Sequence, residues 1–401
     1  MIQEIAIAIS LSILVALVFH KYLRGTISSR LFYLAFSGHL ILGAIVYLYF
    51  AHVAGRSLDM MNFLADANAS TKFLKEYPQL KWLFFSWIDV SSVPLELYPL
   101  WDQTYFLKNS GALHVIKLHV IIDLLTNSNI WIHILLFHSI SFAALLLIIK
   151  SFKSNESSTL LIMSFVPGIL FWTSSMLKEG LVLFGIALIL YGLKTKVIKA
   201  IILFLIGGSL LLLMRSYLAA LLLFSIVIVL LSSKFNYRFN LIQLLLFSLL
   251  VLFASDLLID QGFYSQLINK FSAFDTLEKG GSSFSFLEMN SLLNIIITSL
   301  LAIDITLLKP FSFNSIMLAY LSFENMVCII LCAWAIWSTR KQHLSQQEKI
   351  VYLFTLLCYF VIGFIVRNDG AIHRYKSAIT LVAMLHIANR FYFSKKEPVE
   401  L

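Results

Sequence analysis

The feature that most constrains this chain is a succession of long apolar stretches. Each stretch holds roughly 16–24 mostly apolar residues, close to the helix length that crosses a hydrocarbon core of about 30 Å. They fall at residues 4–19, 31–54, 130–150, 159–175, 178–193, 197–213, 217–232, 241–259, 315–338, 350–366 and 375–393. Strands of a membrane barrel would be about 10 residues long with alternating polarity. The sequence therefore predicts an all-α, polytopic transmembrane bundle of about eleven spans.

Composition excludes a water-soluble protein. Of the 401 residues, 60% are hydrophobic and 13% are charged, whereas a soluble domain has about 25% charged residues. The first stretch follows Glu4 and has neither a basic start nor a small-residue cleavage site, so we expect a retained span rather than a signal peptide. No repeat of fixed period is visible in the sequence. We therefore interpret residues 1–401 as a single integral membrane domain.

The distribution of charge predicts the topology. The formal net charge of +9 would by itself suit a nucleic-acid partner. When residues 20–30 are placed in the cytoplasm, the inner segments hold 16 of the 30 basic residues and only four acidic ones. Cytoplasmic loops carry such an excess of Lys and Arg, so the charge indicates orientation and no nucleic acid is expected. The N-terminus is predicted outside and the C-terminus inside.

Two apolar segments do not fit this topology as spans. If residues 291–308 crossed the membrane, the basic residues of 340–349 would lie outside, against the positive-inside tendency. We expect 291–308, and likewise 114–127, to form re-entrant or interfacial helices on the outer side. Such pieces are tolerated where protein buries them or where they line a wet cavity. The outer loops, at about 55–129 and 260–314, therefore indicate an outward-facing cavity.

Other residue types give weaker signals. The tryptophans of the first outer loop are expected at the membrane interface, with stacking on a sugar or lipid head as the alternative. They are Trp82, Trp87 and Trp101. The three cysteines lie inside predicted spans and are expected to pack as small apolar residues. The ten histidines lack metal-ligand spacing, so no metal site or cofactor is predicted, with a divalent metal left open.

Charged side chains near the predicted spans are the functional candidates, because each costs roughly 2.5–3.5 kcal/mol at a helix centre. In the predicted topology they collect on the outer side. They are Lys178 and Glu179 between the fourth and fifth spans, Arg215 at the next outer turn, Lys309 and Glu324 around the ninth span, Arg367 and Arg374 at the last outer turn, and Asp59 in the first outer loop.

A structural role is the alternative for each candidate. Lys178 and Glu179 could end helices or pair across the bundle, and the arginines could extend to the outer head groups. Lys376 is expected to extend in that way. Glu324 lies so deep that it needs a cationic partner, either Lys178 or one of the arginines at 215 and 374. Asp59 could cap a helix.

The candidates together suit one kind of chemistry. Guanidinium groups bind diphosphate in a planar, bidentate manner and stay charged at any working pH. A polyprenyl-diphosphate sugar donor keeps its tail in the bilayer and presents its head at the surface. A transferase also needs a base, such as a carboxylate, to take the proton from the attacking sugar hydroxyl. The cations would stabilise the departing diphosphate.

Four segments carry a resemblance to known membrane proteins. They are PGILFWTSSMLKEGLVLFGIALILYGL, LLLLMRSYLAALLL, LLKPFSFNSIMLAYLSFENM and VRNDGAIHRYKSAITLVAML. In this order they resemble bacterial repeat-unit (O-antigen or capsule) polymerases and related GT-C-type glycosyltransferase-like proteins. The resemblance implies transfer of undecaprenyl-diphosphate-linked oligosaccharide at the periplasmic face of the cytoplasmic (inner) membrane. Metal-dependent GT-C enzymes have an acidic residue after span one, whereas Asp59 follows span two.

The resemblance also implies roles for individual residues. By position, Arg215 and Arg374 match arginines needed for activity, and Lys178, Glu179 and Glu324 match other polar positions. We therefore expect two sets of site residues. Diphosphate would bind to Lys178, Arg215, Lys309, Arg367 and Arg374, and the base would come from Glu179, Glu324 or Asp59.

Three functional hypotheses remain open at this stage. The first is a glycosyltransferase that polymerises or extends lipid-linked oligosaccharide, with polyprenyl-diphosphate-linked donor and acceptor as partners. The second is a flippase or exporter of such lipids, which should carry cations through the full depth of its cavity. The third is a non-enzymatic membrane component of a polysaccharide complex, bound to its assembly proteins.

Overall fold

The computed structural model is all-helical in the part of the chain that it describes, which confirms the predicted fold class. It describes residues 2–22, 28–52, 59–88, 90–108, 110–151, 167–234, 240–258, 265–268, 301–311, 313, 316–339, 344–366 and 369–394. The chain forms two compact units. Unit 1 comprises Met1–Leu147 and Leu170–Ser216, and unit 2 comprises Ile148–Ile169 and Tyr217–Leu401.

The long helices of unit 1 follow its apolar stretches. They are α1 (Ile2–Tyr22), α2 (Ser29–His52), most of α7 (Ile130–Ser151), α10 (Lys178–Gly192) and the first part of α11 (Val197–Lys234), with α9 (Pro167–Ser174) shared between the units. Packed phenylalanine rings join α2 to α7, among them Phe36 and Phe142 at 5.2 Å between ring centroids. Inside this cluster the Nδ1 atoms of His39 and His138 lie 2.6 Å apart, so one imidazole donates to the other.

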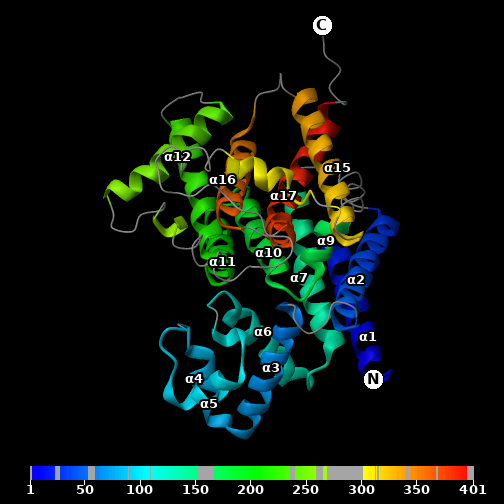
Figure 1. The fold of residues 1–401 in the computed structure, drawn as a ribbon. Coiled ribbons are helices and arrows are strands. Elements are labelled where there is room, and N and C mark those ends of the chain that lie inside the picture. The colour runs from blue at the N-terminus through cyan, green and yellow to red at the C-terminus, as the bar shows by residue number, and fades with distance from the viewer. Residues whose placement is uncertain are drawn as a thin grey trace. The chain divides into compact units, whose positions relative to one another are not determined.

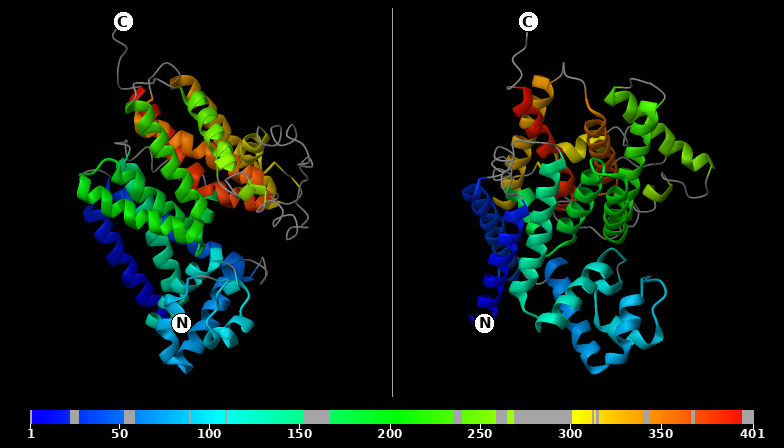
Figure 2. Two further views of the ribbon diagram at one scale, coloured as in Figure 1. Left: turned by 90° about the vertical axis from the view of Figure 1, so that its left-hand side faces the viewer. Right: turned by 180° about the vertical axis from the view of Figure 1, so that it is seen from behind.

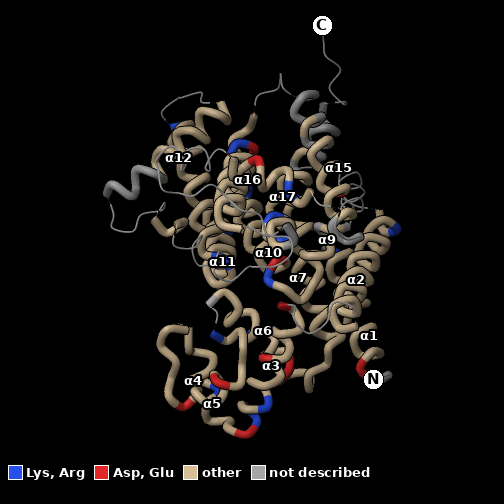
Figure 3. Tube along the Cα trace, in the orientation of Figure 1, with Lys and Arg blue, Asp and Glu red and all other residues tan. Residues whose placement is uncertain are grey.

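A group of short helices in unit 1 occupies the region predicted as the first outer loop. It consists of α3 (Asp59–Glu76), η1 (Pro78–Leu80), α4 (Lys81–Ser86), η2 (Leu95–Leu97), α5 (Tyr98–Gln103), η3 (Phe106–Lys108) and α6 (Ser110–Thr126), and it is visible in Figure 1. Pro78 and Pro99 stand at the starts of η1 and α5, where a missing N–H costs least. In Figure 3 charged residues gather on α3, whereas α1, α2 and α7 carry theirs near their ends.

A buried aspartate holds this group together. The carboxylate of Asp66 on α3 accepts the backbone N–H groups of Tyr105, Phe106 and Leu107 at 3.2, 2.6 and 3.1 Å. These donors lie around η3, which is too short to satisfy its own first N–H groups. Asp66 therefore fixes the segment that leads into α6, and α6 packs along α3.

Unit 2 is built around the helices α16 (Gln346–Ile365) and α17 (Asp369–Ser394), whose described side chains are mostly buried. Its helices are the second part of α11, α12 (Leu241–Leu258), residues 265–268 and 301–308, α15 (Ile316–Thr339), α16 and α17. A capping box between Ser345 and Glu348 begins α16, because both side chains accept otherwise unpaired N–H groups. The helices α15 and α16 each pack on α17 (Figure 2).

A glycine permits the close packing of residues 301–308 on α16. A β-carbon at Gly363 would overlap the carbonyl oxygen of Ala302. One turn later, the hydroxyl of Thr306 donates to the carbonyl of Tyr359 over 2.7 Å. The described part of the segment 291–308 is therefore held against protein on one face, while Leu301 and Leu308 are exposed on the other.

Five described helices are long and apolar enough to span a membrane. They are Gln3–Lys21, Ser29–His52, Ile130–Ser151, Val197–Lys234 and Gln346–Ile365, and the shorter apolar helices are Leu241–Leu252 and Ala319–Ile330. A helix lies within each of the eleven predicted stretches, although residues 159–166 lie outside the described part. With 15 residues, α10 would be about 22 Å long, which is shorter than a hydrocarbon core of about 30 Å. The chain is therefore a membrane protein by its helices, with five candidate spans.

Candidate functional site

Two residues predicted from the sequence, Glu179 and Arg215, form an ion pair in unit 1. Glu179 is the second residue of α10, where the positive end of the helix dipole favours an acid. Arg215 lies inside α11 and has non-helical backbone angles, φ −155° and ψ 84°. Its Nη2 donates to Glu179 Oε1 over 2.6 Å, and the two side chains are 6% and 2% exposed. The predicted acid and cation therefore meet in a site shielded from solvent.

The break at Arg215 has a physical reason. The stretch Val197–Lys234 has 38 residues, and as one straight helix it would be about 57 Å long. That is about twice the thickness of a hydrocarbon core. The break divides the stretch close to the turn predicted between 197–213 and 217–232. Non-helical backbone at membrane depth is tolerated where protein buries it, and Arg215 is buried.

The Glu179–Arg215 pair combines two chemical properties in one place. The guanidinium presents a planar fork of donors that matches phosphate oxygens. The carboxylate can accept a proton. An anion that reached this site would compete with Glu179 for the guanidinium and leave the carboxylate available as a base.

Lys178 connects this pair to α6. Its Nζ donates to the carbonyl oxygen of Gly111 over 3.4 Å, and its side chain is half-buried. Gly111 is the second residue of α6. Lys178, the first residue of α10 and the neighbour of Glu179 in the sequence, is therefore bonded to the beginning of α6.

A chain of buried polar groups runs from α6 to Met176, just before α10. Asp123 Oδ1 lies 2.9 Å from Nε2 of His133, and His133 Nδ1 lies 2.9 Å from Nδ1 of His119. His119 Nε2 lies 3.3 Å from the carbonyl oxygen of Met176, three residues before Glu179. The hydroxyl of Thr71 donates to Asp123 Oδ2 over 3.4 Å. Asp123, His133 and His119 are all buried.

The hydrogen bonds fix where the protons of this chain lie. Burial lowers the pKa of His119 to about 3, so its ring is neutral at neutral pH and carries one N–H. The carbonyl of Met176 can only accept, which places that N–H on Nε2 and leaves Nδ1 to accept from His133. His133 Nε2 in turn forms a hydrogen bond with Asp123 Oδ1, so the chain ends on a carboxyl group.

Lys117 on α6 is buried and bonded to backbone. Its Nζ donates to the carbonyl oxygens of Phe85, over 3.2 Å, and Trp87. Burial lowers the pKa of Lys117 to about 8. Trp87 is itself buried, and its ring packs edge-on against Trp101 at 5.6 Å. The membrane-interface role expected for Trp87 is therefore replaced by a packing role, whereas Trp82 is 82% exposed.

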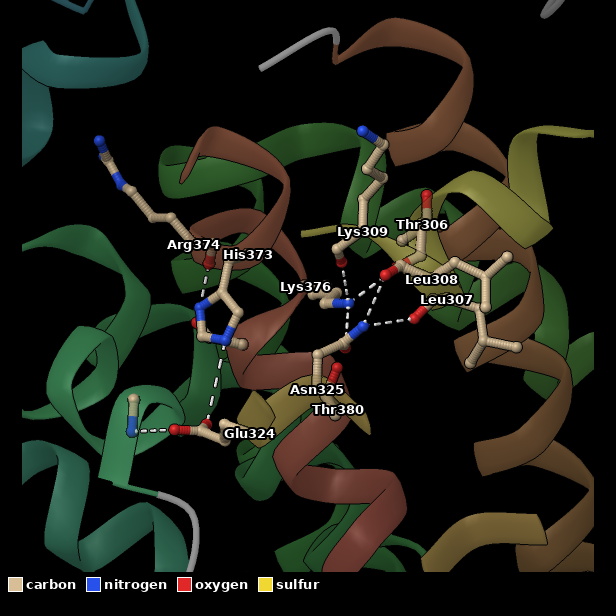
Figure 4. A network of polar contacts seen from close by, with 12 residues as sticks. Thr306, Leu307, Leu308, Lys309, Glu324, Asn325, His373, Arg374, Lys376 and Thr380 are labelled. Carbon is tan, nitrogen blue, oxygen red and sulfur yellow. Dashed lines mark hydrogen bonds and ion pairs between the residues drawn. The ribbon is translucent and has the colours of Figure 1, made fainter. Parts of the chain in front are cut away.

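Glu324, the deepest predicted carboxylate, lies in unit 2. Its Oε2 accepts the backbone N–H of Gly168 over 2.6 Å, and its Oε1 lies 3.9 Å from Nε2 of His373 (Figure 4). A β-carbon at Gly168 would overlap Glu324 Oε2. A backbone group and a histidine are thus among the partners of Glu324, and Tyr320 also forms a side-chain hydrogen bond with it.

Lys376 is the centre of a second cluster in unit 2. Its Nζ donates to Asn325 Oδ1 over 2.6 Å and to the carbonyl oxygens of Thr306, over 2.8 Å, and Lys309. Asn325 donates in turn to the carbonyls of residues 307 and 308, both over 2.9 Å. Lys376 is 3% exposed, so the expectation that it extends to lipid head groups is wrong. Together the two side chains satisfy the carbonyl groups at the end of helix 301–308.

The other predicted residues are less closely connected. The backbone carbonyl of Lys309 joins the Lys376 cluster, and the Arg374 side chain points away from Glu324 and Lys376 in Figure 4. The Arg374 guanidinium carbon lies 5.8 Å from the ring centre of Tyr375. Asp59 is the first residue of α3, a position that suits the helix-terminal role left open for it. Arg367 lies outside the described residues.

The sequence analysis missed the chain formed by Asp123, His133 and His119. Its search for histidines used metal-ligand spacing, and within the described part of the chain no group of three or more His, Cys, Asp or Glu residues is placed to hold a metal ion. The available signal was different. His119 and Asp123 are four residues apart on one helix face, and His133 follows across a short turn.

Comparisons with protein-family models, with curated proteins and with solved structures found no match for this chain. The functional argument therefore rests on the side chains and their contacts.

Proposed function

We propose that this protein is an integral membrane glycosyltransferase that polymerises or extends oligosaccharide linked to undecaprenyl diphosphate, in the biosynthesis of a surface polysaccharide. The observation that carries the proposal is the buried Glu179–Arg215 ion pair at a break between apolar helix segments. A buried charge pair is costly to build into a membrane protein, and such residues are functional candidates by default.

The proposed reaction uses both members of the pair. A hydroxyl oxygen of the acceptor sugar attacks the anomeric carbon of the donor, and the bond from that carbon to the diphosphate oxygen breaks. The diphosphate leaves with the electron pair, and Arg215 stabilises its increasing negative charge. Glu179 takes the proton of the attacking hydroxyl. Lys178, next to Glu179, adds positive charge on the same side.

The remaining predicted residues take secondary places in the proposal. Glu324 is bonded to Gly168 and lies near His373, so we assign the base to Glu179. The diphosphate-binding roles of Lys309, Arg367 and Arg374 and the catalytic role of Asp59 stay predictions. No resident metal is part of the proposed chemistry, and a divalent ion bound together with the diphosphate is compatible with it.

The proposed topology has about eleven crossings, with the N-terminus outside and the C-terminus inside the bacterial cytoplasmic (inner) membrane. The excess of basic residues in the predicted inner segments supports it. The break of α11 at Arg215 supports the separation of 197–213 from 217–232. In this topology the Glu179–Arg215 pair faces the periplasmic side, where lipid-linked repeat units are presented.

The experiment is a deletion of the gene in its own host, followed by separation of the surface polysaccharide by length. We expect single repeat units in the deletion strain and full-length polymer when the wild-type gene is restored. Restoring it with Arg215→Lys, which keeps the charge and loses the bidentate fork, should lower polymer formation by about 100-fold, the effect of losing one donor to a developing anion.

A charge-reversed control separates catalysis from structural pairing. The double variant Glu179→Arg, Arg215→Glu keeps an ion pair at this position, so it should be recovered in the membrane fraction in normal amount yet make no polymer. Full-length polymer from this variant would reduce the pair to a structural salt bridge. A deletion strain that displays no repeat unit at all would favour the flippase hypothesis instead.

A further inference from the structure

A cavity of about 370 Å³ in unit 1 lies next to the Asp123–His133 pair. Side chains from α2, α3, α6 and α7 and from the turn between α6 and α7 line it, among them Tyr47, Asn62, Asn68 and Ser128. Asp123 and His133 also line the cavity, and they are 4% and 1% exposed. Ala65, Asn68 and Ser128 are exposed. The cavity therefore has an exposed rim and a buried floor that carries a titratable pair.

The size and chemistry of the cavity limit what it can bind. Ligand pockets in proteins start at about 300 Å³, so this cavity suits one ring rather than a chain. No Lys or Arg is among its described lining residues, which disfavours a phosphate. Both oxygens of Asp123 already have a side-chain partner, His133 and Thr71, which disfavours a lone cation. Beside the apolar residues Met61, Leu64, Ala65 and Ile130, the lining holds amide, hydroxyl and carboxylate groups, and these form hydrogen bonds with sugar hydroxyls.

The floor retains hydrogen-bonding capacity for a ligand. The two oxygens of a carboxyl group offer more hydrogen-bonding sites than the two contacts described for Asp123, with His133 and Thr71, occupy. The side chains of Asn62 and Asn68 lie six residues apart on α3 and add donors and acceptors along one wall. A hydroxyl-rich ring can therefore be held from the floor and the wall together.

The cavity is also connected to the segment 176–179, which ends at Glu179. The helix that carries Asp123 contacts this segment twice within unit 1, through His119 and the Met176 carbonyl and through Lys178 and the Gly111 carbonyl. A ligand bound against Asp123 would therefore rest on the same helix that positions the start of α10.

We propose that this cavity binds one neutral sugar ring, with Asp123 and His133 as the floor of the site and Asn62 and Asn68 as its wall. The proposal rests on the proposed function in one respect, since it takes the ring to belong to the lipid-linked oligosaccharide. Asp123 and His133 are assigned to binding and positioning, and the base remains Glu179.

The test measures protection of a thiol at the rim. The full-length protein in lipid nanodiscs, with its three native cysteines replaced by alanine, would carry Ser128→Cys at the exposed rim, and the rate of maleimide labelling would be followed. The probes are free glucose, galactose, rhamnose and N-acetylglucosamine. At twice its dissociation constant a competing sugar slows labelling by about threefold. Lys81→Cys on α4, an exposed position outside the cavity, is the matched control and should not be slowed.

Two further variants keep the outcome decisive. Asp123→Asn should abolish protection. Because this change alters a buried pair, a second variant is needed that leaves the floor intact. Ala65→Phe at the exposed rim fills the cavity and should also abolish protection. The proposal is overturned if none of the four sugars slows labelling at position 128. It is also overturned if sodium phosphate or tetramethylammonium slows labelling more than every sugar does.

The two proposals can fail separately. Sugar protection together with normal polymer from Arg215→Lys would leave the sugar site standing and remove the polymerase proposal. Loss of polymer in Arg215→Lys without sugar protection would remove only the sugar site.

Discussion

The buried functional candidates of the two units have different partners. In unit 1 the carboxylate of Glu179 is paired with the guanidinium of Arg215. In unit 2 the carboxylate of Glu324 accepts the backbone N–H of Gly168 and lies 3.9 Å from His373, and Lys376 donates to backbone carbonyls and to a side-chain amide. Backbone partners also hold Asp66 and Lys117 in unit 1. Backbone groups left open at helix ends need partners wherever water is absent. The difference teaches that burial alone does not identify a functional charge, because the nature of its partner distinguishes a reactive pair from a structural bond.

The largest expected effect separates the two carboxylates by activity. Glu179→Gln should lower the rate of polymer formation by about 100-fold or more, since it removes the proposed base. Glu324→Gln should change that rate by less than about tenfold, because the amide oxygen can still accept the Gly168 N–H. Both variants would be compared at equal protein level in the membrane. If Glu324→Gln caused the greater loss, the roles assigned to the two carboxylates would have to be exchanged.

The next effect is on stability. Lys376→Met should lower the free energy of unfolding by about 3–5 kcal/mol, the cost of removing one member of a buried polar cluster, because the three oxygens that it serves lose their donor. Thermal unfolding in detergent measures it. Lys234→Met, at an exposed lysine of the same unit, is the control and should leave the midpoint nearly unchanged. A Lys376→Met protein as stable as this control would contradict the structural role.

A smaller effect concerns the contact between Gly168 and Glu324. Gly168→Ala should destabilise the protein by about 1–3 kcal/mol, the usual cost of overpacking, because the new methyl group would overlap Glu324 Oε2. The same change made in a Glu324→Ala background should cost less, since the overlapping atom is gone. A double-mutant cycle of unfolding free energies measures this coupling. Additive costs would show that the two positions do not interact.

The last expected effect is a pH dependence from Lys117 in unit 1. Its pKa is lowered from 10.5 to about 8 in the folded protein. Between these values the unfolded chain binds more protons than the folded protein, so stability should rise with pH, by at most about 1.4 kcal/mol per pH unit. Below pH 8 the full penalty of the buried charge applies. His114, whose own pKa is lowered by burial and by Lys117, stays neutral throughout this window.

The measurement is the difference in unfolding free energy between wild type and Lys117→Met across pH 8 to 10.5. Subtracting the variant cancels the other lysines and tyrosines that titrate in the same range. A difference that stays constant with pH would mean that Lys117 keeps its ordinary pKa in the folded protein.

The sequence predicted the helices better than their contacts. Long apolar stretches specify helices by length alone, so α1, α2, α7, α15 and α16 lie close to their predicted places. The turn at Arg215 was predicted because one cation interrupts an apolar run. Which partner each charge would choose depends on tertiary packing, and so the bonds of Lys376 and Glu324 could not be derived.

The site of unit 1 was predictable in part. Glu179 and Arg215 stand out because charge is rare in such sequence, yet their pairing over 36 residues follows only from the fold. The buried chain of Asp123, His133 and His119 gives a weak signal, since isolated histidines in apolar helices are common packing residues. Its meaning depends on proton positions that only the hydrogen-bond geometry reveals.

The order of Glu179 and Arg215 along the chain has a consequence for biosynthesis. Because translation proceeds from the N-terminus, the ribosome releases Glu179 36 residues before Arg215. When the arginine leaves the insertion machinery its counter-ion is already present. The two apolar segments between them can then enter the bilayer as a hairpin whose buried charges cancel, while the turn with Lys194, Lys196 and Lys199 stays on the inner side. A chain with the same two residues in distant spans would have to insert each charge alone.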